Sequence, residues 1–140
     1  MKTREQWVEE VMKTKTDREL LELAAKAANM DVMWDRKELA DFCAKREGMW
    51  LKGMRSDSAN CEYWNPLTSD GDAFRLAVKL QLTVCNDQVA SGYTYCIDGD
   101  KDVNFPAVRS GKNENKVIDE DYVAARRAIV LAAAKIGESK

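Results

Sequence analysis

The sequence contains no histidine among its 140 residues. Histidine is the commonest general base near neutral pH, and it serves Ser-His-Asp catalysis, Cys-His catalysis and many metal sites. Its absence excludes active sites of these kinds. The cysteines are equally uninformative for chemistry, because none of the four lies in a C-x-x-C pair: Cys43, Cys61, Cys85 and Cys96. Isolated cysteines favour buried free thiols in a reducing compartment over a zinc site. We therefore expect no metal and no cofactor.

A strong charge imbalance and long apolar runs are also missing. The net charge is −2, which provides no long-range attraction to nucleic acid and is small for a protein that mimics DNA. No apolar run approaches the roughly 18 residues that a membrane-spanning helix needs. The N-terminus is charged and amphipathic, unlike a secretory signal. These features predict a cytoplasmic protein with neither a nucleic-acid partner nor a membrane partner.

Apolar residues make up 45% of the chain, whereas proline and glycine number only 2 and 7. A chain of this length and composition can bury a core of its own. We predict a single α+β domain over residues 1–140, with three or more helices packed on a small, mainly antiparallel sheet of about four strands. Residues 1–15 are expected to form an N-terminal helical extension, because Thr3 and Gln6 make a capping pair before apolar residues at helical spacing.

Helix and strand signals follow one another along the rest of the chain. Capping pairs such as Thr16 with Glu19, and Asp35 with Glu38, indicate where helices begin. The helices are expected at residues 16–29, 35–47 and 69–80 and from residue 119 onward. The strands are expected at residues 31–34, 49–51, 62–65, 82–85, 93–97 and 103–105. Residues 54–60 and 110–116 are polar and predict loops.

The stretch from Glu62 to Leu80 combines an aromatic strand end, a proline turn and an apolar helix. Pro66 restricts its own φ and directs Asn65 towards an extended conformation. Ser69 and Asp72 form an S-x-x-D capping pair at the helix start. Apolar side chains then cover most of the helix and leave one narrow polar stripe, which consists of Asp72, Arg75 and Lys79. This pattern predicts a central helix that is largely buried.

The last helix presents a different pattern. Its expected buried face consists of Tyr122, Ala125, Ile129, Ala132 and Ile136. Arg126 and Arg127 lie off that face. One interpretation is that both arginines are exposed to solvent, and the other is that they grip a phosphate or an acidic partner.

Three groups of residues carry a resemblance to a known family. They are residues 23–28, then residues 64–67 with 70–73 and 75–80, and then Tyr122 with residues 124–130, 132–134 and 136–137. Together they resemble a small uncharacterised protein family of tailed phages and prophages, which is loosely similar to NinX-type phage proteins. The similarity covers roughly residues 20–137. It implies a phage or prophage origin and the host cytoplasm, and it implies no particular chemistry.

Two classes of function remain open. In the first, the chain is a phage accessory protein that acts by non-catalytic binding, with a host protein as partner in a host-takeover or anti-defence role. In the alternative, it binds a small nucleotide-like ligand near the turn at Trp64, where Tyr63 and Trp64 would stack and Asn65 would bond a base edge. Arg75, Arg126 or Arg127 would then hold phosphate.

Catalysis ranks below both of these functions, and no catalytic residue is predicted. Asp70 and Asp72 could hold Mg²⁺, but helix capping accounts for both carboxylates more simply. The predicted binding residues are Tyr63, Trp64, Asn65, Asp70, Asp72, Arg75, Arg126 and Arg127.

Overall fold

The computed structural model describes residues 15–35, 48–51, 63–87, 92–98, 103–105, 107–109 and 117–140. In this part of the chain the helices are α2 (Asp17–Ala27), α3 (Asp70–Lys79) and α5 (Asp119–Glu138). The strands are β1 (Val32–Asp35), β2 (Gly48–Leu51), β3 (Leu82–Asp87), β4 (Tyr93–Asp98), β5 (Val103–Asn104) and β6 (Val108–Arg109). All pairings are antiparallel, so the α+β class is confirmed.

Several predicted segments cannot be compared with this structure. The helical extension at residues 1–15 lies almost wholly outside the described residues, and so does most of the helix expected at residues 35–47. The predicted loops at residues 54–60 and 110–116 are outside them as well. The prediction that residues 1–140 form one domain therefore stays a prediction.

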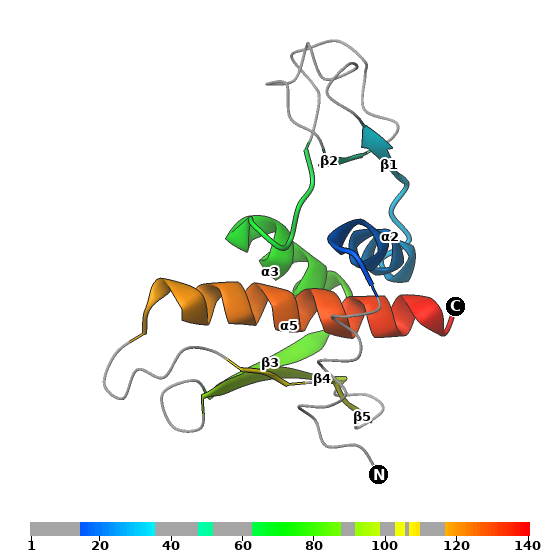
Figure 1. Cartoon of the computed structure of the whole chain (residues 1–140). Helices are drawn as coiled ribbons and strands as arrows, with labels where there is room; N and C mark the ends of the chain where they lie inside the picture. The colour runs from blue at the N-terminus through cyan, green and yellow to red at the C-terminus, as the bar shows by residue number, and fades with distance from the viewer. Residues whose placement is uncertain are drawn as a thin grey trace.

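Helix α5 lies between two layers of structure (Figure 1). Helices α2 and α3 pack on one side of it, and strands β3 and β4 pack on the other. Because neighbours approach from both sides, every residue from Ala128 to Ala134 is buried. Alanine fills much of this stretch, and its small side chain lets both layers approach closely. Helix α5 is therefore the central helix of the fold.

The expectation that α3 is largely buried is wrong. Ala73, Leu76 and Ala77 are buried, but Phe74 and Val78 are 68% and 59% exposed. The main contacts of α3 are with α5 and β3, and these two elements cover one face of the helix. Its apolar residues extend around the helix beyond that face, so counting them overestimates its burial.

The expected buried face of α5 is right at Ile129 and Ala132, which are buried, and Ala125 and Ile136 are half-buried. It is wrong at Tyr122, which is exposed. The first turns of α5 extend beyond α2 and α3 in Figure 1, whereas the buried middle of the helix lies against its neighbours.

The larger sheet is built around β4. Strand β3 pairs with one edge of β4, and both β5 and β6 pair with the other edge. Thr94 lies opposite Val108 and Ile97 lies opposite Asn104, so three steps along β4 correspond to four steps along its neighbour. Residue 106, which lies between these two pairings, is outside the described residues. Within the described residues this sheet consists of β3, β4, β5 and β6 and is three strands wide. The sequence patterns do not predict β6.

The two shorter strands form a ribbon of their own. Strands β1 and β2 pair with each other and belong to a separate sheet from β4. The Trp64 N–H donates a 2.9 Å hydrogen bond to the Met49 carbonyl, so the segment at Trp64 runs beside β2. The strands expected at residues 31–34, 49–51, 82–85, 93–97 and 103–105 are all present to within a residue or two.

The ends of α2 agree closely with the sequence signals. Thr16 is the N-cap, and its side-chain oxygen accepts a 3.2 Å hydrogen bond from the Glu19 N–H. Asn29 follows the helix with a φ of 55°, the left-handed conformation that asparagine tolerates. Helix α3 ends in the same way, with Gln81 at a φ of 54° before β3 begins.

The thiol of Cys96 provides a pH-dependent probe of the core beneath α5. Burial, with a smaller contribution from Cys85, raises the pKa of Cys96 from 9.0 to about 12. Between pH 9 and pH 12 the unfolded chain therefore binds fewer protons than the folded chain. We expect the free energy of unfolding to fall across this range by up to ~1.4 kcal/mol per pH unit from this group.

Urea denaturation of the wild type and of Cys96→Ala at several pH values measures this effect. The slope of the free energy of unfolding against pH should differ between the two proteins. The cavity in the variant lowers its stability by the same amount at every pH, so it does not change the slope. Parallel slopes would contradict the assignment.

Candidate functional site

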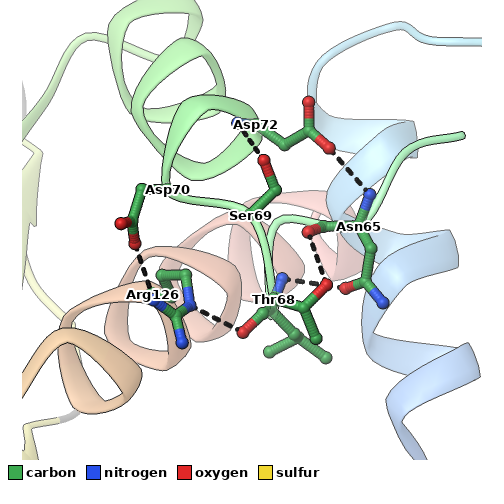
Figure 2. A network of polar contacts seen from close by, with 7 residues as sticks. Asn65, Thr68, Ser69, Asp70, Asp72 and Arg126 are labelled. Atoms are coloured by element: carbon green, nitrogen blue, oxygen red, sulfur yellow. Dashed lines mark hydrogen bonds and ion pairs between the residues drawn. The ribbon is translucent and has the colours of Figure 1, made fainter. Parts of the chain in front are cut away.

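Asn65 is the centre of a polar network in the turn that precedes α3 (Figure 2). Its side-chain Oδ1 accepts a 3.0 Å hydrogen bond from the Leu67 N–H, which is an Asx turn. Its carbonyl accepts from the N–H groups of Thr68 at 3.1 Å and Ser69 at 2.9 Å. Pro66 lies inside this turn and has no N–H that would need a partner. Asn65 thus accepts from the three N–H groups that follow Pro66, and these bonds close the turn before the helix begins.

The start of α3 is capped as the sequence predicts, with one difference. The Ser69 Oγ accepts from the Asp72 N–H at 3.2 Å, so Ser69 is the N-cap. In a capping box the Asp72 carboxylate would accept from the Ser69 N–H. Here the Ser69 N–H already donates to Asn65, and Asp72 Oδ2 accepts from the Asn65 N–H at 3.0 Å instead. The carboxylate therefore joins the helix start to the strand end before it.

Arg126 connects this turn to the central helix. Its Nε donates to the Leu67 carbonyl at 2.8 Å, and its Nη1 donates to Asp70 Oδ1 at 2.6 Å. The side chain is only 16% exposed, so the interpretation that Arg126 is exposed to solvent is wrong. The physical reason is that the turn lies over α5 and presents a carbonyl without a backbone partner to the guanidinium.

Arg127 lies apart from this network. Its Nη2 contacts Asp17 Oδ1 at 3.2 Å, and its side chain is also mostly covered. The interpretation of solvent exposure is wrong here too. The contact joins the first turn of α2 to α5.

Both aromatic residues of the predicted stacking site have partners within the protein. Trp64 is 4% exposed and belongs to the hydrophobic core. The Tyr63 Oη accepts a 3.3 Å hydrogen bond from the Asn65 Nδ2. A ligand could reach the face of Trp64 only if the core opened, so these contacts support a structural role for Trp64.

Most of the predicted site residues are therefore close together, but they satisfy one another. Asp72 Oδ1 accepts from Arg75 Nη2 at 2.7 Å, and Asp70 is paired with Arg126. Both aspartates thus face an arginine, which opposes binding of a cation. Within the described residues, no group of three or more Cys, Asp or Glu side chains is placed to hold a metal ion. The network acts as a brace between α3 and α5.

Exposed apolar side chains form a second candidate site. Among the described residues, the large hydrophobic residues that are exposed are Phe74, Val78, Val117, Tyr122 and Val123. They lie on α3, in the first turns of α5 or, in the case of Val117, two residues before α5 begins. We call Val117, Tyr122 and Val123 the α5 entry patch. The exposed carboxylates of Asp119 and Glu120 lie within the same turn, so the patch is apolar with an acidic border.

Hydrogen bonds fix the first turns of α5, which carry the α5 entry patch. Asp121 is buried, and its Oδ2 accepts a 2.8 Å hydrogen bond from the Ile118 N–H, which fixes the first turn of α5. One turn later, Arg126 is tied to the Leu67 carbonyl. Sequence patterns miss this patch because Tyr122 has the helical spacing of a core residue.

Comparison with protein-family models, with curated proteins and with solved structures finds no match to this chain. The resemblance to a phage family accordingly stays a prediction that rests on the sequence motifs. No helix within the described ranges combines the length and the apolar character needed to cross a membrane.

Proposed function

We propose that this chain is an accessory protein of the phage type that acts by binding a host protein, without catalysis. The observation that carries the proposal is the α5 entry patch. Val117, Tyr122 and Val123 are each about half exposed, at 54%, 53% and 47%, on a helix start whose backbone is capped and braced. Exposed apolar side chains gathered on a rigid element are characteristic of protein-binding surfaces.

The chemistry of the patch indicates the kind of partner. Tyr122 offers a large amphipathic ring, the type of side chain that often dominates binding energy. Asp119 and Glu120 border the apolar residues, so a partner with an apolar centre and basic residues around it would complement this surface. The polar turn at Asn65 supports the same conclusion indirectly, because its charged groups already have partners inside the protein.

We expect native mass spectrometry of tagged protein, recovered gently from bacterial lysate, to reveal a host protein in a defined stoichiometry. Val123→Glu should reduce its recovery by at least about tenfold, because a charge replaces an apolar contact in the patch. Thr83→Glu is the matched control, since it places the same charge on an exposed β-branched residue of β3, outside the patch. Equal losses in both variants would argue against the α5 entry patch as the binding surface.

The small-ligand alternative gives a different result in the same measurement. It predicts an extra mass of a few hundred daltons and no protein partner. If Val123→Glu also retained this mass, the result would overturn the proposed function and support a small-ligand site near the turn at Asn65.

A further inference from the structure

The exposed residues of α3 form a pattern that is symmetric along the helix. They are Asp70, Gly71, Phe74, Arg75, Val78 and Lys79, which we call the α3 outer face. The positions of these residues are symmetric about the midpoint between Phe74 and Arg75, although the residue types are not. Residues 71, 74, 75 and 78 have the spacing i, i+3, i+4 and i+7, so they share one side of the helix. A face with this symmetry can pack against a second copy of itself running in the opposite direction.

We propose that the α3 outer face binds the α3 outer face of a second copy of this chain, in an antiparallel, two-fold contact. In a two-fold interface, if residue i contacts residue j of the partner, then j also contacts i. Centring the contact between Phe74 and Arg75 places Asp70 opposite Lys79, and Gly71 opposite Val78. It also places Phe74 opposite Arg75. The first of these pairs joins opposite charges, and the last places a guanidinium against an aromatic ring.

The charges favour this register over others. Asp70 begins α3 and Lys79 ends it, so each copy is acidic at one end of the face and basic at the other. An antiparallel pairing brings each acidic end to a basic end, whereas a parallel pairing would oppose like charges. The side chain of Asp70 is 72% exposed although it is paired with Arg126, so it can accept a second cation. The guanidinium of Arg75 is likewise exposed and can lie over the Phe74 ring of the other copy.

Gly71 leaves room for the Arg75 side chain of its own copy. A Cβ at position 71 would lie 3.2 Å from Arg75 Nη1 and 3.3 Å from Nη2, so the guanidinium that pairs with Asp72 lies over this glycine. In the proposed contact Val78 of the other copy therefore meets the Arg75 side chain where it covers Gly71.

The expected affinity follows from the size of the contact. A ten-residue helix is about 15 Å long, so a contact through α3 alone is smaller than a standard protein–protein interface. We expect a dissociation constant on the order of 100 µM for this contact. The α3 outer face shares no residue with the α5 entry patch, so different substitutions test the two contacts.

A charge-complementation experiment on the full chain tests this pairing. Lys79→Asp leaves two acidic residues facing each other across the interface, and Asp70→Lys leaves two basic ones. Sedimentation velocity up to about 500 µM should show that each variant alone self-associates at least about tenfold more weakly than the wild type. An equimolar mixture should recover dimers, because both acid–base pairs form again in the mixed species. Lys26→Asp, at an exposed lysine in the last turn of α2, is the control and should dimerise like the wild type.

Three outcomes would overturn the inference. The first is a wild type that sediments as a monomer over the whole concentration range. The second is a dimer that neither variant weakens, and the third is a dimer that the mixture fails to recover, since both would place the interface elsewhere. Thermal melts of both variants at low concentration establish that they are folded. Recovery of a host protein by the same variants reports separately on the proposed function, because the α5 entry patch is unchanged in them.

Discussion

Gly137→Ala should lower the free energy of unfolding by about 3 kcal/mol or more, a large effect for one methyl group. Gly137 is where α2 crosses α5. A Cβ at this position would lie 2.0 Å from the Leu23 carbonyl oxygen and 2.8 Å from its carbon. The obstacle is backbone inside a helix, so it cannot turn away as a side chain can. The helices would have to separate, with loss of packing along the α2–α5 contact.

The matched control is Gly71→Ala in α3. There the new Cβ would meet the guanidinium of Arg75 at 3.2 Å, which is the far end of a flexible side chain. Alanine should raise stability by up to about 1 kcal/mol through its higher helix propensity. Chemical denaturation of both variants at low protein concentration compares the folded monomers. Similar stability in Gly137→Ala and the wild type would mean that α2 and α5 are farther apart than the structure places them.

Sequence-based predictions are accurate for features that depend on neighbouring residues, and they fail for features that depend on contacts between distant elements. The cap at Thr16, the end of α2 near Asn29 and the strands β3, β4 and β5 depend on neighbouring residues, and these predictions are confirmed. The identity of the central helix depends on which elements pack on it from both sides. Phe74 and Tyr122 have the helical spacing of core residues, yet both are exposed because no described element covers them. Periodicity alone therefore could not distinguish α5 from α3.

In the candidate site, too, the local contacts are predictable from the sequence and the long-range contact is not. The residue types at the turn correctly indicate a cap at Ser69, and they bring Tyr63, Asn65 and Asp72 into one network. The sequence could not reveal that the Leu67 carbonyl faces Arg126, because the two residues are 59 positions apart. Without that contact, an arginine in the middle of a helix resembles a free cation. Because Arg126 already donates to the Leu67 carbonyl, it is a weaker candidate for a phosphate ligand.

Arg126→Met should lower the free energy of unfolding by about 2–3 kcal/mol, because it leaves the buried Leu67 carbonyl without its donor. Methionine retains much of the length of the side chain, so the loss of packing is small. Asp70→Asn removes only the charge at the exposed end of the network. Since exposed ion pairs contribute little, it should cost less than about 1 kcal/mol. Urea denaturation of the two variants separates the backbone contact from the ion pair.

Arg127→Met is the second comparison, because Arg127 contacts the exposed carboxylate of Asp17 and no carbonyl contact accompanies that pair among the described residues. We expect a cost below about 1 kcal/mol for this variant as well.

If Arg126 braces the turn against α5, stability should fall in Arg126→Met while recovery of a protein partner by the remaining folded protein is unchanged. A variant of normal stability that fails to recover the partner would instead place Arg126 in the binding surface, and the brace would lose its main support.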